Sequence, residues 1–222
     1  MRTKAIIIKK QNTNEYDQLV ICYTEEFGKL TAVARSVLKK DSIQAMHLDV
    51  LNMVNFELVN GRAIPIITSA QLENGYHHLK SNLASLALAY FFIEIIDKLV
   101  FDNEKDVVFW QFLADLIGDL DRKAATGGHE LSSFFRNKQQ EFLTVMGYTP
   151  NMSECSRCSC YVKGSYAAYS IELGGILCSD CFLSGCRGVF LRNSDANLAE
   201  IIFENIAGKK LESLSFIHSV VK

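Results

Sequence analysis

The sequence predicts an α+β fold in which a small five-stranded β-barrel is followed by an α-helical domain that carries a four-cysteine insertion. Three observations lead to this prediction. Five short runs rich in β-branched residues open the chain, apolar residues then recur at helical spacing, and two C-x-x-C pairs interrupt the helical part. We expect the domains to be 1–78 and 79–222, with the insertion at about 151–187.

The predicted strands lie at residues 4–10, 19–24, 29–35, 50–59 and 62–69, separated by polar or glycine-containing turns. Asn60-Gly61 predicts a type I′ hairpin turn between the last two, because both residue types tolerate a positive φ. Pro65 lacks an amide donor and is expected at a strand edge or a bulge. Five short strands in about 75 residues suit a closed barrel of the OB type.

From Leu79 onward the apolar period becomes helical. The apolar run at 86–96 is too short to cross a bilayer and predicts a buried helix. A second stripe covers 109–120, and a third helix at 130–146 ends at Gly147, with Pro150 beyond it. We expect Ser194 to cap a helix that reaches Gly208, and a last helix to cover 211–221. The pattern therefore predicts buried helical stripes and no membrane segment.

Four cysteines form two close pairs, Cys155 with Cys158 and Cys178 with Cys181, with nineteen residues between the pairs. Each pair lets two thiolates of one turn reach the same tetrahedral cation, and residues 166–175 can return the chain as a hairpin. Unpaired thiols or two disulfides are the alternatives, but the spacing and the lack of a secretion signal favour Zn²⁺. Because four protein ligands leave no open position, we expect this zinc to be structural.

The other three cysteines are expected to take no part in metal binding. Cys160 follows the first pair at a spacing that fits a single turn less well than i and i+3, and we interpret it as a spectator. Cys22 and Cys186 are expected to be buried or half-buried thiols. The odd count of seven and residues 1–10, which contain no apolar signal-peptide segment, favour a reducing cytoplasm.

The net charge of −2 hides an uneven distribution. Residues 1–40 hold eight Lys and Arg against four Asp and Glu, a balance of +4, whereas 81–154 hold six against eleven, a balance of −5. This polarity would direct a polyanion to the N-terminal part. The candidate phosphate contacts along the barrel are Arg2, Lys9, Lys10, Lys29, Arg35, Lys39, Lys40 and Arg62.

Each of these cations taken alone is also consistent with a solvated surface charge, and only their clustering favours nucleic acid. Three aromatic residues in the same part, Tyr16, Tyr23 and Phe27, could stack on bases or fill the barrel core. Enzyme motifs are missing from the sequence. A zinc deaminase needs H-x-E, whereas His129 and Glu130 are adjacent, and there is no Walker loop, G-x-G-x-x-G or nucleophile elbow. We therefore expect no catalysis.

In this order of elements the chain resembles the RecO family of bacterial recombination mediators and DNA repair proteins. The likeness spans nearly the whole chain. It is carried by AIIIK at 5–9, NEYDQL at 14–19, TEEFGKLTAVAR at 24–35, Ser42, Leu143, MGYTP at 146–150, the first C-x-x-C pair, and GGILCSDC at 174–181. Where that family has a glycine and an Arg/Lys-rich turn, this chain has RSVLKK at 35–40.

The resemblance implies a protein of the bacterial cytoplasm, associated with the nucleoid, that binds single- and double-stranded DNA and anneals complementary strands. It also implies cooperation with RecR to load RecA onto DNA coated with single-strand-binding protein, without catalysis. Two alternatives are a general zinc-containing module for single-stranded nucleic acid, and a protein-docking scaffold that does not bind DNA. Strand annealing separates the first from the second, and salt-sensitive DNA binding separates both from the third.

Overall fold

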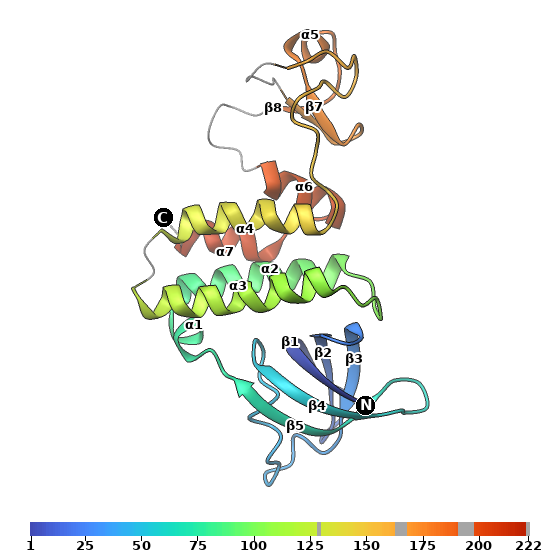
Figure 1. Ribbon diagram of the computed structural model, residues 1–222, viewed down its shortest axis with the longest axis vertical. Coiled ribbons are helices and arrows are strands. Elements are labelled where there is room, and N and C mark those ends of the chain that lie inside the picture. Colours follow the sequence, from blue (N-terminus) through green and yellow to red (C-terminus); the bar gives the residue numbers. More distant parts are fainter. Residues whose placement is uncertain (128–129, 163–167, 191–197, 221–222) are drawn as a thin grey trace. The chain divides into compact units, whose positions relative to one another are not determined.

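The computed structural model describes residues 1–127, 130–162, 168–190 and 198–220 (Figure 1). The chain divides into two compact units. The first comprises Met1–Ser132 together with Leu211–Lys222, and the second comprises Ser133–Lys210.

The first unit opens with a closed β-barrel, as predicted. Its strands are β1 (Arg2–Asn12), β2 (Gln18–Thr24), β3 (Gly28–Ala34), β4 (Met53–Val59) and β5 (Ile66–Asn74). They are ordered β1-β2-β3-β5-β4, and β1 pairs with β4. All pairings are antiparallel except that of β3 with β5, where Val33 lies opposite Ile66. This short parallel contact brings the start of β5 to the end of β3.

The barrel interior is filled by alternate side chains of its strands. β3 shows the alternation most clearly, because every second residue from Gly28 to Ala34 is buried. Val37 and Leu48, from the segment between β3 and β4, are also buried in this core. The barrel is therefore packed with side chains, and a ligand has access only to its outer surface and its ends.

The turn between β4 and β5 differs from the prediction. Six residues, 60–65, separate the two strands, and neither Asn60 nor Gly61 has a positive φ. The type I′ turn is therefore wrong. Gly61 is instead required by a close approach, because a Cβ there would lie 2.0 Å from the Ile64 carbonyl oxygen. Pro65 lies just before β5, and its carbonyl accepts from the Val33 N–H at 2.9 Å.

Four helices complete the first unit, at α1 (His77–Ser81), α2 (Leu83–Leu99), α3 (Val107–Ala125) and α7 (Glu212–Val220). Asn82 caps α2 by accepting from the Ser85 N–H at 2.9 Å, and Asp106 caps α3 by accepting from Phe109 at 3.0 Å. Most of the run at 86–96 is buried within α2, as expected, although Tyr90 is exposed. Within the described residues, no helix is long and apolar enough to cross a membrane.

Glu94 of α2 holds the first turn of α7. Its carboxylate accepts from the Ser213 N–H at 3.0 Å, the Ser213 hydroxyl at 2.5 Å and the Glu212 N–H at 3.2 Å, and it pairs with Lys98. Burial alone would raise the pKa of Glu94, but the hydrogen bonds from Lys98 and Ser213 hold it below the ordinary value of 4.5. The carboxylate therefore accepts hydrogen bonds from N–H groups that have no partner within α7, at a helix start that lies far away in sequence.

We expect Glu94→Gln to lower the free energy of unfolding of the first unit by roughly 1–2 kcal/mol at neutral pH, because it removes charge-assisted hydrogen bonds. Since the pKa of Glu94 is lowered in the folded state, its contribution is present above about pH 4.5 and lost as the pH falls through the folded pKa. Urea unfolding at both ends of this range measures the effect. Glu57→Gln, which breaks an exposed pair with Arg2, is the control and should change little. Equal loss in both variants would contradict the role of Glu94.

The second unit combines helices with a small three-stranded sheet that lies close in sequence to the cysteine pairs. Its elements are most of α4 (Leu131–Val145), then β6 (Ala168–Ser170), β7 (Gly175–Leu177), α5 (Ser179–Leu183), β8 (Val189–Phe190) and α6 (Leu198–Ala207). Gly147 ends α4 with φ 75°, and the Tyr148 N–H donates to Leu143 at 2.8 Å, as the predicted glycine stop requires. Phe142 of α4 packs on Phe203 of α6. The predicted cap Ser194 lies outside the described residues.

Candidate metal centre and nucleic-acid interface

Two tight turns present the paired cysteines. In the first, the Cys155 N–H donates to the Cys160 carbonyl at 2.9 Å and the Ser159 N–H donates to the Cys155 carbonyl at 2.8 Å. Ser159 makes this turn in the left-handed region, at φ 56°. In the second, Cys178 caps α5, and its sulfur accepts from the Cys181 N–H at 3.5 Å. The bonds of the first turn thus join backbone groups and close the loop, whereas the second turn directs a backbone N–H toward sulfur.

A β-hairpin brings the two turns together. β6 and β7 pair antiparallel, with Tyr169 opposite Ile176, and this confirms the expected return of the chain before Cys178. The Ser156 N–H then donates to the Ile176 carbonyl at 2.9 Å, which joins the first turn to the strand that leads into the second. A Cβ at Gly175 would lie 2.0 Å from the Ser156 hydroxyl, so a larger residue there would require the Ser156 side chain to rotate away.

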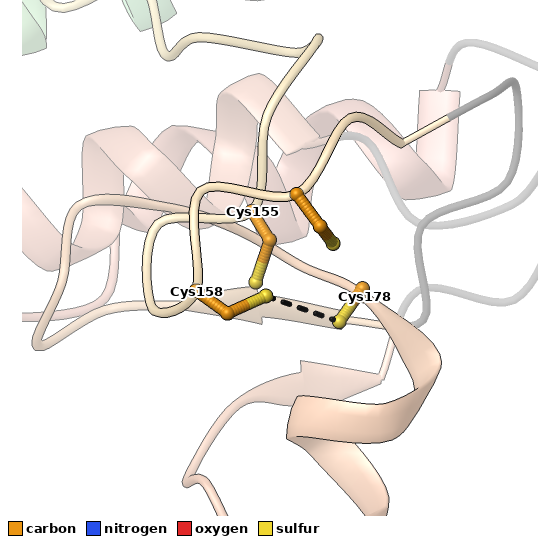
Figure 2. Close-up of side chains that lie close together, drawn as sticks. Cys155, Cys158 and Cys178 are labelled. Atoms are coloured by element: carbon orange, nitrogen blue, oxygen red, sulfur yellow. Dashed lines mark hydrogen bonds between the residues drawn. The ribbon is translucent and has the colours of Figure 1, made fainter.

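Four sulfur atoms, from Cys155, Cys158, Cys160 and Cys178, lie within 4.8 Å of one another. Figure 2 shows the side chains of Cys155, Cys158 and Cys178 converging. The sulfur atoms of Cys158 and Cys178 lie 3.8 Å apart. A tetrahedral zinc with Zn–S bonds of about 2.3 Å places its sulfurs about 3.8 Å apart. All seven cysteines are free, so the disulfide alternative does not hold. The residues therefore fit a thiolate-bound cation.

The local field favours the thiolate at two of these cysteines and the protonated thiol at two others. Burial by itself would raise the pKa of Cys155, but N–H groups of Cys178 and Cys158 donate to its sulfur and lower the pKa to about 6. The N–H and thiol of Cys160 lower the pKa of Cys158 in the same way. Conversely, the hydrogen bond to Cys158 raises the pKa of Cys160 to about 12, and another bond to Cys158 raises the pKa of Cys181. Thiols must lose their protons to bind a metal, so a cation bound here would displace the protons of these cysteines.

Three of the four predicted ligands, Cys155, Cys158 and Cys178, belong to this group of four sulfurs, whereas the fourth, Cys181, does not. The structure places Cys160, interpreted from its spacing as a spectator, beside Cys158 and Cys178. Cys181 is buried one turn into α5, with its thiol bonded to Cys158 and Cys178. The sequence signal that could have identified Cys160 is its C-x-C spacing from Cys158.

The expectation for the two remaining cysteines is confirmed. Cys22 is fully buried in β2, where its thiol lies 3.5 Å from the Leu30 carbonyl, and burial raises its pKa to about 12. Cys186 is half-buried and accepts from Arg157 at 2.6 Å.

The predicted basic residues fall into three groups, of which the first is Lys29 alone. Only 11% of its side chain is exposed, and its ammonium donates to the carbonyls of Asp97 and Val100 at the end of α2 and pairs with Asp102 at 3.4 Å. Lys29 thus joins the β2–β3 turn to the C-terminal end of α2, where a cation is favourable.

The second group consists of cations that already have a carboxylate partner. Arg2 pairs with Glu57 at 2.6 Å, Lys9 with Asp97 at 2.9 Å and Lys10 with Asp49 at 3.2 Å. A phosphate would have to replace these partners, which lowers the net gain from each contact.

The third group, which we call the basic end, comprises Arg35, Lys39, Lys40 and Arg62. All four are exposed, and none of them forms an ion pair within the described part of the chain. The first three follow β3, and Arg62 lies in the β4–β5 loop, which the Val33–Ile66 pairing brings to the end of β3. They therefore surround one end of the barrel.

The β1–β2 loop reaches the same end and supplies an aromatic ring. Tyr16 is 50% exposed, its carbonyl accepts from the Leu38 N–H at 3.0 Å, and the Lys39 ammonium lies 5.3 Å from its ring centre. Tyr23, by contrast, is buried against Phe109, and Phe27 packs on the barrel core. Of the three predicted aromatic residues, only Tyr16 is available for stacking.

One carboxylate organises these loops. Asp17 accepts from the Ser36 N–H at 2.7 Å, and this bond, with others from Asn14 and the charge of Arg35, lowers the pKa of Asp17. Ser36 itself has φ 54°, a left-handed conformation that favours glycine. This is the position where the sequence lacks the expected glycine, and the chain adopts the turn nonetheless.

Comparison with known proteins agrees with this architecture. The family model for the recombination protein O N-terminal domain matches residues 1–76, and that for the recombination protein O C-terminal domain matches 80–222. The protein named DNA repair protein RecO of Roseiflexus sp. (strain RS-1) is 29% identical over 180 residues, which cover 81% of this chain and 62% of that protein.

Two further proteins of the same name show a similar relationship. That of Dehalococcoides mccartyi (strain CBDB1) is 27% identical over 81% of this chain and 69% of its own length, and that of Cutibacterium acnes is 26% identical over 81% and 73%. The alignment thus spans less than two thirds of the Roseiflexus protein. Since the two family models together cover nearly every residue, the chain belongs to the RecO family.

Proposed function

We propose that this chain is a DNA repair mediator that binds single- and double-stranded DNA and anneals complementary strands. With RecR, it helps to load RecA onto DNA coated with single-strand-binding protein in the bacterial cytoplasm. Family membership and the names of its relatives support this role. The observation that carries it is the basic end of the barrel, where four exposed cations lie outside any ion pair of the described residues and one of them, Lys39, lies over the exposed ring of Tyr16.

The chemistry of the basic end suits a nucleic-acid strand. None of its four cations forms an ion pair within the described part of the chain, although the charges of Arg35 and Lys39 act on nearby Asp17. Each phosphate that these cations neutralise releases a counterion. Tyr16 offers a π-face to an unstacked base, which is the usual second component of single-strand binding. The ion-paired Arg2, Lys9 and Lys10 would extend the track along the barrel. Lys29 contributes by positioning the β2–β3 turn.

We further propose that Cys155, Cys158, Cys178 and Cys181 hold one structural Zn²⁺. The support is the convergence of thiols and the small size of the local core, which contains Val162, Ala168, Ile176 and Leu177 besides cysteines. So few apolar side chains stabilise a fold of this size poorly without a metal. In this scheme residues 1–78 bind DNA, and 79–222, with the zinc insertion, bind protein partners without any catalysed reaction.

Annealing tests the function directly. The purified chain should accelerate the pairing of complementary strands coated with single-strand-binding protein, measured by fluorescence quenching between labelled strands. The triple variant Arg35→Glu, Lys39→Glu, Lys40→Glu should lose most of this acceleration, because it reverses three of the four free cations. Binding without annealing would favour the general single-strand module. Absence of DNA binding would favour the docking scaffold.

A further inference from the structure

The metal centre contains one thiol more than a tetrahedral cation needs. Cys155, Cys158, Cys160 and Cys178 form a mutually close set of four sulfurs. Cys181, the fourth ligand predicted from the sequence, adjoins this set, because it is buried in α5 and its N–H donates to the Cys178 sulfur at 3.5 Å. Five cysteines are therefore candidates for a site that would bind four.

The backbone explains why Cys160 reaches the site. The left-handed turn at Ser159 and the hydrogen bond from the Cys155 N–H to the Cys160 carbonyl fold the chain back on itself. Bridge pairing between Glu154 and Tyr161 then closes the loop on the other side. Cys160 is thereby held opposite Cys155 by the same backbone that shapes the first pair.

Cys181 has a comparable position from the other turn. It lies in the first turn of α5, its N–H donates to the Cys178 sulfur at 3.5 Å, and its side chain is buried. Cys160 is exposed, whereas Cys155, Cys158 and Cys178 are common to both possible sets of four. The two candidates for the last position thus differ in burial but not in ligand chemistry.

We propose that Cys155, Cys158 and Cys178 are constant ligands and that Cys160 and Cys181 share the fourth position. In either arrangement the three constant thiolates and one of Cys160 and Cys181 would hold the cation, and the thiol left out would keep its proton. The charge of the site would therefore be the same in both. This inference rests on the proposed metal centre, and it predicts that either thiol can be lost without loss of the metal.

Zinc content of the purified full-length chain, measured by mass spectrometry after dialysis, tests the proposal. Cys160→Ser and Cys181→Ser should each retain about one equivalent, whereas the double variant and Cys158→Ser should fall below about half an equivalent. Cys186→Ser, which changes a neighbouring thiol outside the set, is the matched control and should retain the metal.

Co²⁺ titration gives a second readout that does not depend on metal carried through purification. Both single variants should show the absorption bands of tetrahedral cobalt bound to thiolates, and the double variant should not. If either single variant loses metal as completely as Cys158→Ser, the position is not shared and the proposal is overturned. Full retention in the double variant also overturns it. A wild-type chain that binds neither metal would refute the metal centre itself.

Discussion

Cys158→Ser is expected to remove the metal and to unfold the insertion locally. The two cysteine turns and the β6–β7 hairpin are joined by few apolar contacts, so the bonds to the cation are the main tie between them. Binding of structural zinc by small domains is worth about 10–16 kcal/mol in peptides, and most of that is folding free energy. Losing one constant ligand should therefore leave the segment largely unstructured.

Limited proteolysis and hydrogen exchange, read by mass spectrometry, measure this effect. Residues 151–187 should lose protection in Cys158→Ser, while the barrel, which has its own core, stays protected. Cys22→Ser is the control for metal content, because Cys22 is buried in the barrel away from the cysteine group. A Cys158→Ser variant that keeps its zinc and its protection would show that the metal does not hold the insertion.

Gly28→Ala should be among the most destabilising single substitutions in the first unit. Gly28 has φ 67°, and a Cβ there would lie 2.0 Å from the Glu104 carbonyl oxygen, which is backbone and cannot rotate away. The α2–α3 loop is fixed at this point, because the Asn103 N–H donates to Lys29 at 2.8 Å and Lys105 pairs with Glu26. Left-handed strain and overpacking together should cost about 2–5 kcal/mol.

Two other glycines separate the causes. Gly147 has φ 75° with open space around its Cβ position, so Gly147→Ala should cost only about 1 kcal/mol from strain. Gly118 lies within α3 with no atom nearby, and Gly118→Ala should stabilise by roughly 0.5–1 kcal/mol. Denaturant unfolding of the three variants gives the order. Similar losses of unfolding free energy in Gly28→Ala and Gly147→Ala would show that the α2–α3 loop moves to accommodate the new Cβ, and would contradict this account of Gly28.

Local patterns predicted most of the fold. The strand runs and the glycine stop of α4 are each encoded within a few residues, and the structure has both. Of the two cysteine pairs, it brings Cys155, Cys158 and Cys178 into one group. Barrel closure follows from the number and length of the strands. What these patterns share is that their physical causes are local in sequence.

The differences arise either where a distant segment decides or where a local backbone conformation gives no signal in the residue types. Lys29 looked like a phosphate contact because the sequence cannot show that the end of α2, some seventy residues later, receives its ammonium. Gly61 looked like a turn glycine, but its requirement comes from the Ile64 carbonyl in a longer loop. The preference of a tight turn for ligands at i and i+3 excluded Cys160, but the left-handed conformation of Ser159, which no glycine signals in the sequence, places Cys160 beside the other sulfurs.

The salt dependence of DNA binding tests the central claim most directly. For single-stranded DNA, four phosphate contacts predict a log–log slope of about −3, and Lys39→Glu with Lys40→Glu should flatten it by about one to two units. Lys209→Glu with Lys210→Glu, which reverses another exposed adjacent pair and changes the net charge equally, should leave the slope unchanged. Flattening by the first pair alone is the predicted result. An unchanged slope in the Lys39 and Lys40 variant, or equal flattening by both pairs, would contradict DNA binding at the basic end of the barrel.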